Sequence, residues 1–320
     1  MGAFLIYSAH SGLFLVQGVI RFAERKYSPA FLTAIFLAVL LTAVGAPVPR
    51  EVVIGLLVVG VVLFGLPHGA IDPLIAKQAM GNRTLYNWTL YNRSSYSWAG
   101  FYGVYSLMAL LYGVLWWSYP AATLASFLVI SGFHFGEDWE GRFPDWIRLS
   151  YGVAVVTVPM LFHSREVVEI YAAVGASAVE NFVIASQVLA LIAAPIALFS
   201  ALIRWRQRPA DLLEIVAIVG GALVLQPLLF FVCYFCLLHS PRHLFKTARA
   251  VGLTTAGGLV RAALPTLVAS VAGGLMFWVL LPPGTGDERI FRVIFIGLAA
   301  LTIPHMALAA VAQRVTLHPA

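Results

Sequence analysis

The chain has 320 residues, of which 61% are hydrophobic and 11% are charged, and its formal net charge is +6. A soluble domain has about a quarter of its residues charged, and several apolar runs here reach the ~18 residues that a membrane span needs. The composition therefore excludes a soluble protein and predicts an integral membrane protein. The runs have helical rather than alternating periodicity, which argues against a β-barrel. The basic residues lie between the runs, which is typical of contact with anionic lipid head groups and not with nucleic acid.

We predict an all-α, polytopic helical bundle that forms one membrane-embedded domain over residues 1–320, with about ten spans and with eight or nine also compatible. The N-terminal segment 1–28 is mildly apolar and interspersed with polar residues, which is compatible with an interfacial helix or a weak span. It lacks the basic start and small-residue cleavage site of a signal peptide, so we expect it to be retained. The predicted spans are 30–46, 51–76, 98–117, 120–138, 147–163, 182–203, 211–225, 227–248, 262–281 and 290–312.

The division at residue 227 depends on one proline. The apolar region 211–248 is too long for one span, and Pro227 lies in its middle, where proline breaks or kinks a helix. With two spans instead of one, Arg242, Lys246 and Arg249 fall on the cytoplasmic side, where basic residues are favoured. The charge pattern therefore supports the division.

Two histidines four residues apart, His239 and His243, lie near the end of this apolar region. Positions i and i+4 share one face of a helix, and two imidazoles at that spacing can bind one metal ion. When the basic loops are placed in the cytoplasm, His68, His134 and His305 fall in the same inner half of the bundle. A hydrogen bond to a neighbouring helix would explain any one of them. Five at one depth favour a shared metal site, because unpaired polar groups in lipid are costly.

Three carboxylates accompany these histidines. Asp72 is four residues after His68, and Asp138 and Glu137 are four and three residues after His134. A metal-bound histidine usually donates its other N–H to a carboxylate or carbonyl. We expect these acids to orient the histidines or to serve as additional ligands. The alternative is that they are helix-end residues at the cytoplasmic surface, an alternative that is stronger for Glu137 than for Asp72.

The residue types leave several metals open. An imidazole set without an obvious thiolate suits Fe(II), Cu or Zn, and we expect Cys233 and Cys236 to be buried hydrophobic residues rather than a redox or metal pair. Ligands on helices of an apolar bundle imply a greasy substrate that enters from the bilayer. Fe(II) with open positions would suit O2 chemistry on such a substrate, whereas Zn would suit hydrolysis of a lipid amide or ester.

Four motifs stand out: PHGAxD at 67–72, FHFGEDW at 133–139, HSPRH at 239–243 and IPHM at 303–306. In this order and spacing they resemble the Brp/Blh family of membrane β-carotene 15,15′-dioxygenases, over the chain from about residue 50 to its end. The FHSREV stretch at 162–167 also looks like an element of that family. None of these motifs is specific alone, but the set is.

The resemblance implies oxidative cleavage of β-carotene at its central 15,15′ double bond with O2, giving two molecules of all-trans-retinal. By motif, Fe(II) would be held by four histidines, and His305, Asp72, Asp138 and Glu137 would support them or line the pocket. His163, at the outer end of its span, would be structural. The implied iron ligands are His68, His134, His239 and His243.

The resemblance also implies a multi-pass protein of the cell (inner or plasma) membrane, with retinal passed on to a microbial rhodopsin. An apolar tunnel would set the register of cleavage. Nearby aromatic rings would stabilise a cationic or radical polyene through their negative faces, with ordinary helix packing as the alternative. These rings are Phe133, Phe135, Tyr234 and Phe235.

Two other classes of function remain open at this point. A lipid desaturase or hydroxylase also uses intramembrane histidines, but it typically carries several clusters of the H-x-x-H-H type, and this chain has one H-x-x-x-H. A transporter or channel would use the histidines as a path for protons or metal ions. One bound iron per chain argues against a desaturase-type di-iron centre, and metal uptake without O2 consumption favours a transporter.

Overall fold

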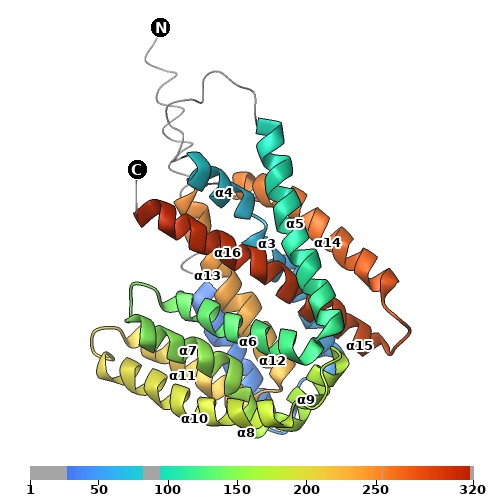
Figure 1. Cartoon of the computed structure of the whole chain (residues 1–320). Coiled ribbons are helices and arrows are strands. Elements are labelled where there is room, and N and C mark those ends of the chain that lie inside the picture. Colours follow the sequence, from blue (N-terminus) through green and yellow to red (C-terminus); the bar gives the residue numbers. More distant parts are fainter. Residues whose placement is uncertain (1–26, 82–93, 254, 318–320) are drawn as a thin grey trace.

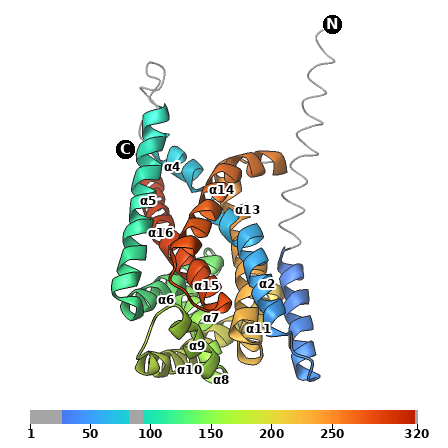
Figure 2. The ribbon, with the colours of Figure 1, turned by 90° about the vertical axis from the view of Figure 1, so that its right-hand side faces the viewer.

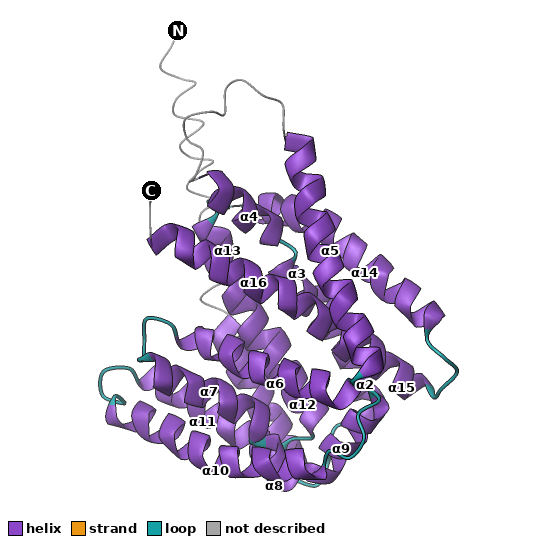
Figure 3. Cartoon of the chain, viewed as in Figure 1, coloured by secondary structure: helices purple, strands orange, loops and turns teal. Residues whose placement is uncertain are grey.

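The computed structural model of the chain describes residues 27–81, 94–253 and 255–317. Within these residues the chain forms helices joined by turns and short loops, and it contains no strand (Figure 3). The predicted N-terminal segment 1–28 lies almost entirely outside the described residues. A helix over Tyr27–Ala43 comes first. It is followed by α2 (Arg50–Gly60), α3 (Leu66–Gly69), α4 (Asp72–Gly81), α5 (Ser94–Ser118), α6 (Pro120–Gly136), α7 (Asp145–Thr157), α8 (Pro159–Phe162), α9 (Ser164–Ala173), α10 (Glu180–Ile203), α11 (Pro209–Val224), α12 (Pro227–Phe231), α13 (Ser240–Ala250), α14 (Ala256–Leu280), α15 (Gly286–Phe291) and α16 (Gly297–Leu317).

Seven helical stretches of the described chain are long and apolar enough to cross a membrane. The predicted fold class, a polytopic helical bundle, is therefore confirmed, and the protein is a multi-pass membrane protein. Each of the ten predicted spans coincides with a helix, but three of those helices are shorter: Tyr27–Ala43, α6 and α11. The seven stretches are Arg50–Ala79, Trp98–Ser118, Asp145–Phe162, Glu180–Ile203, Pro227–Ala250, Ala256–Leu280 and Gly286–Ala312.

The helices form two groups with α16 between them. Figure 1 shows α6, α7, α10 and α11 gathered in the lower part of the view, and α5 and α14 in the upper right. In the turned view, α2 and the segment leading into α13 run close together (Figure 2). Few residues of α5 and α14 are buried, with 6% of the span window buried in each. These two helices therefore contribute little to the core of the described chain.

Close packing of α6 against α7 depends on glycine. A Cβ atom on Gly152 would lie 1.7 Å from the carbonyl oxygen of Gly132, and one on Gly136 would lie 2.7 Å from that of Arg148. Small residues let helix backbones approach closely, and this favours helix association in membranes. His134 lies between the two α6 glycines, so this contact sets the position of its backbone.

Three π-helical stretches interrupt the core helices. Such stretches change the face that following residues present, and they are frequent at functional sites. Here each lies in a helical segment that carries a histidine of the predicted site, namely His68, His239 or His305. The stretches are Val61–Gly65, Val232–His239 and Arg292–Ile296.

Candidate metal centre

The structure brings together the five histidines that the sequence placed at one depth. Neighbouring ring centroids lie between 4.7 and 6.2 Å apart. In three of the rings, one nitrogen each lies within 4.8 Å of the others, a spacing at which one metal ion can be held. These three are His68 of α3, His134 of α6 and His239, which directly precedes α13; His243 of α13 and His305 of α16 complete the cluster.

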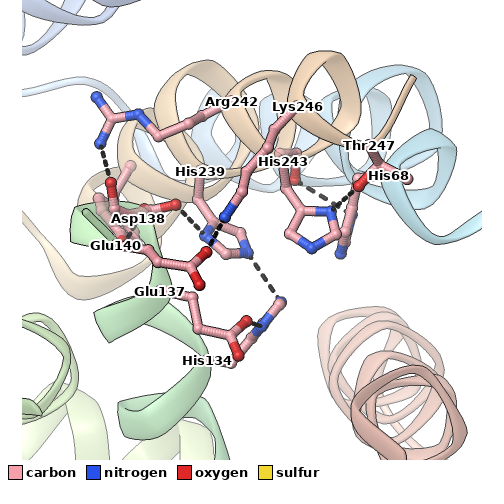
Figure 4. A network of polar contacts seen from close by, with 12 residues as sticks. His68, His134, Glu137, Asp138, Glu140, His239, Arg242, His243, Lys246 and Thr247 are labelled. Atoms are coloured by element: carbon pink, nitrogen blue, oxygen red, sulfur yellow. Dashed lines mark hydrogen bonds and ion pairs between the residues drawn. The ribbon is translucent and has the colours of Figure 1, made fainter. Parts of the chain in front are cut away.

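Each of the five rings is anchored through its Nδ1 atom. When Nδ1 carries the proton and donates it to an oxygen, Nε2 keeps its lone pair and is free to bind a metal. Figure 4 shows these contacts for His134, His239 and His243. The Nδ1 atoms contact Gly65 O (His68), Glu137 Oε2 at 3.1 Å (His134), Asp138 Oδ1 at 3.1 Å (His239), Thr247 Oγ1 at 3.4 Å (His243) and both carboxylate oxygens of Asp72 at 2.9 Å (His305).

The Nε2 atoms of His134 and His239 face each other at 3.1 Å. Both rings use Nδ1 on a carboxylate, so two lone pairs meet and repel unless a cation or proton lies between them. Two imidazole nitrogens bound side by side at about 2.0–2.1 Å from one ion lie roughly 3 Å apart. In addition, Nε2 of His305 is buried without a hydrogen-bond partner among the described residues. The donor set therefore fits a metal ion.

Two of the three carboxylates reach different histidines from those that the sequence spacing suggested. Asp72 contacts His305 instead of His68, because a turn at residues 70–71 separates α3 from α4 and the i,i+4 relation is lost. Asp138 contacts His239 instead of His134, because α6 ends at Gly136 and continues as a 3₁₀ turn. Glu137 directly follows α6 and does reach His134, because residues three apart lie on the same face of a helix.

Comparison with known proteins assigns the family. The family model described as "Beta-carotene 15,15'-dioxygenase" matches residues 59–312, which includes all five clustered histidines. The chain belongs to the β-carotene 15,15′-dioxygenase family. This confirms the resemblance drawn from the motifs, and with it the prediction of an enzyme of the carotenoid-cleaving oxygenase class.

Two relatives of this dioxygenase family cover most of the chain. The "Beta-carotene 15,15'-dioxygenase" of uncultured marine bacterium 66A03 is 27% identical over 259 residues, which is 78% of this chain and 90% of the relative. The "Probable beta-carotene 15,15'-dioxygenase Blh" of Halobacterium salinarum is 26% identical over 299 residues, which is 81% of this chain and 84% of the relative. No solved structure matches the chain.

A buried ionic network supports Asp138 in this dioxygenase-family chain. Tyr234 donates a hydrogen bond to Asp138 Oδ2 at 2.8 Å, and Arg242 Nη1 lies 3.5 Å from the Asp138 carbonyl. Arg242 also donates to Glu214 Oε2 at 2.7 Å, although the sequence placed it at the cytoplasmic surface. The Asp138 carboxylate is therefore held by Tyr234 and accepts a hydrogen bond from His239 Nδ1.

Several of these supporting residues were not predicted from the sequence. Glu214 and Asp211 are acids within a predicted span, and an ionisable residue in a membrane is a functional candidate by default. Arg142 pairs with Asp211 at 3.0 Å, so the network extends from α13 through α11 to the loop after α6. Their position inside an apolar run was the available signal.

Glu137 lies in a different environment from Asp138. Its side chain is 26% exposed, whereas that of Asp138 is 3% exposed. It lines a cavity of about 610 Å³ together with Lys246 and His243. Its partial exposure agrees with the alternative of a helix-end residue at the surface. Its contact with His134 agrees with the predicted role of orienting that histidine.

Three of the four predicted aromatic rings contact the histidines. The Phe135 centroid lies 4.8 Å from that of His239, and Phe235 lies 5.7 Å from the rings of both His68 and His239. Tyr234 stacks on His239 at 6.1 Å. The expectation for Phe133 is wrong, because its side chain is 56% exposed. Successive helix positions point about 100° apart, so Phe133 faces outward when His134 faces the core.

His163 lies outside the histidine cluster. Its Nε2 donates to the carbonyl oxygen of Leu223 at 3.2 Å, which ties the loop between α8 and α9 to the end of α11. Cys233 and Cys236 are buried in the π-helical stretch and unbonded to each other, as expected of small apolar residues.

Proposed function

We propose that the chain cleaves β-carotene at its central 15,15′ double bond with O2 to give two molecules of all-trans-retinal, at an iron(II) centre within the membrane. Four imidazoles would hold the iron: His68, His134, His239 and His243. The observation that carries the proposal is the convergence of these rings, each anchored through Nδ1, inside apolar helices of a chain of this family. In the reaction the double bond breaks and each of its two carbons receives one oxygen atom of O2.

When bound, ferrous iron would supply the redox chemistry that activates O2. The protein's own contribution is to orient neutral imidazoles. Asp138 and Glu137 accept the Nδ1 protons of His239 and His134, which leaves Nε2 unprotonated and directed at the centre. The carbonyl of Gly65 and the hydroxyl of Thr247 do the same for His68 and His243.

The substrate must be recognised by shape, because β-carotene has no polar group to mark its centre. Phe135 and Phe235 pack against His239 and exclude water from that side of the cluster. Their negative faces would stabilise positive charge that develops on the polyene. An apolar tunnel that places the central bond over the iron stays a prediction, as does passage of retinal through the bilayer to a microbial rhodopsin. We place the enzyme in the cell membrane.

The test is expression in Escherichia coli cells that accumulate β-carotene, with iron supplied, followed by pigment extraction and chromatography. The expected result is bleaching of the cells with retinal as the cleavage product. His163→Ala serves as the matched control, since that histidine lies outside the cluster, and it should bleach like the parent chain. Intact carotene beside folded, iron-loaded protein would reject the proposed reaction. Cleavage products shorter or longer than retinal would reject the central register.

A further inference from the structure

We infer that His305 is a fifth imidazole ligand of the proposed metal centre, held in place by Asp72 and Tyr105. The inference rests on the proposed iron site and extends it, because His305 lies outside the set of four that the motifs implied. From the sequence, His305 was predicted only to support the ligands or to line the pocket. Three observations support the role of a ligand: the position of the ring, its unpaired nitrogen and its surroundings.

The first observation is position. The centroid of the His305 ring lies 5.4 Å from that of His68, 5.2 Å from His134 and 5.0 Å from His243. The four implied ligands lie 4.7 to 6.2 Å from one another. The His305 ring therefore lies as close to three of the four implied ligands as those ligands lie to one another.

The second observation is an unpaired nitrogen. His305 is 4% exposed, and its Nδ1 lies 2.9 Å from both carboxylate oxygens of Asp72. Nδ1 therefore carries the proton, and Nε2 carries a lone pair. Nε2 is also fully buried without a hydrogen-bond partner, the one histidine nitrogen of which this holds in the described chain. Leaving a buried polar atom unpaired is costly, and a metal ion would satisfy it.

The third observation is that the surroundings of His305 repeat those of His239. The Asp138 carboxylate lies 3.1 Å from Nδ1 of His239 and accepts a hydrogen bond from the Tyr234 hydroxyl at 2.8 Å. The Asp72 carboxylate lies 2.9 Å from Nδ1 of His305 and accepts a hydrogen bond from the Tyr105 hydroxyl at 2.8 Å. Carboxylates that orient metal-bound imidazoles make this kind of contact. A purely structural link between α4 and α16 would explain the Asp72 contact but not the buried, unpaired Nε2.

His305→Asn separates the two roles. The asparagine amide can donate an N–H to Asp72 from about the place of Nδ1, but it has no atom at the place of Nε2. A structural link would survive this change, whereas a ligand would be lost. His163→Ala is the matched control, and His305→Ala removes both contacts. Purified chains in lipid nanodiscs would be loaded anaerobically with ferrous iron. Iron affinity would then be measured by metal analysis, and the number of imidazole ligands by X-ray absorption at the iron edge.

We expect His305→Asn to bind iron more than about 100-fold more weakly, beyond the 10- to 100-fold that loss of an orienting partner typically costs, and to show one imidazole fewer. Asp72→Asn should fall within that smaller range with the imidazole count unchanged. An unchanged count and affinity in His305→Asn would overturn the inference and leave the four-histidine iron site standing. Parent protein that binds no iron at all would instead overturn the proposed iron site, and this inference with it.

Discussion

Two carboxylate–imidazole pairs lie at the centre of the molecule with nearly the same local geometry but different support. In both, an aspartate accepts from an Nδ1 atom at about 3 Å and from a tyrosine hydroxyl at 2.8 Å. In both, the aspartate and the histidine come from different helical segments. The pairs are Asp138–His239, between the turn after α6 and the start of α13, and Asp72–His305, between α4 and α16.

The two pairs differ in the residues that surround the aspartate. Asp138 has the Arg242 guanidinium beside its backbone, and Arg242 is paired with Glu214, so the pair belongs to a buried ionic network. Asp72 is held by a tyrosine hydroxyl and an imidazole. Breaking the Asp138 pair should therefore affect folding as well as metal binding, because buried charges lose partners. Breaking the Asp72 pair should affect metal binding more than folding.

The largest effect is expected from His239→Ala, which removes one of the two facing Nε2 atoms. Iron binding should fall by more than about 100-fold, since even loss of an orienting partner costs 10- to 100-fold, and retinal formation should be lost. Asp138 loses the imidazole, which should lower stability, but it keeps Tyr234 and the nearby Arg242, so the protein should remain inserted in the membrane. Iron per chain and retinal yield are the measurements. A variant with full iron and full turnover would remove His239 from the ligands.

Next in size is Arg242→Met, which removes the closer of the two arginines beside the buried Glu214 and leaves it Arg142 at 3.8 Å. Removing one partner of a buried ion pair typically costs about 3–5 kcal/mol of stability. The double variant Arg242→Met with Glu214→Gln should recover much of this loss, because no buried charge is then left unpaired. Thermal unfolding in detergent would measure both. Equal stability of the single variant and the parent chain would show that the network does not support the Asp138 side.

The sequence could predict most of the helices and the membership of the cluster. Apolar runs ended by basic or proline residues have clear limits, so the break at Pro227 agrees with the start of α12. The depth of each histidine in the membrane could be predicted from the direction of its span, and the rings of all five predicted histidines lie together in one cluster. These features depend on composition and order along the chain.

Contacts between helices could not be predicted in the same way. The prediction that Asp72 contacts His68 assumed one continuous helix. The turn at residues 70–71 interrupts that helix, and Asp72 contacts His305 instead, more than two hundred residues away in sequence. The burial of Arg242 likewise depends on Glu214 from another helix. Such pairings depend on helix rotation and packing, which π-helical stretches and helix ends change without a clear sequence signal.

A smaller effect is expected from Gly152→Ala, which disturbs the α6–α7 contact on the Asp138 side. The new methyl would overlap the Gly132 carbonyl oxygen at 1.7 Å, so α7 must move away from α6. Overpacking of this kind costs about 1–3 kcal/mol, and the shift of His134 should also weaken iron binding. Gly113→Ala on α5 is the matched control, since nothing lies within 4 Å of its new atom. It should be neutral or slightly stabilising, by up to about 1 kcal/mol. Equal melting temperatures for the two variants would contradict the close contact.

The smallest effects are expected from the two tyrosine variants, and they compare the two pairs most directly. Tyr234→Phe and Tyr105→Phe each remove one 2.8 Å hydrogen bond to a carboxylate and little else. Asp138 keeps the nearby charge of Arg242, whereas Asp72 loses one of its two side-chain partners. Iron affinity should therefore fall by less than about 10-fold in both, below the range for loss of the orienting carboxylate itself, and it should fall further in Tyr105→Phe. Metal titration of both variants in parallel tests the order. The reverse order would mean that Tyr234 holds Asp138 more firmly than the ionic network does, and the contrast between charged and uncharged support would not hold.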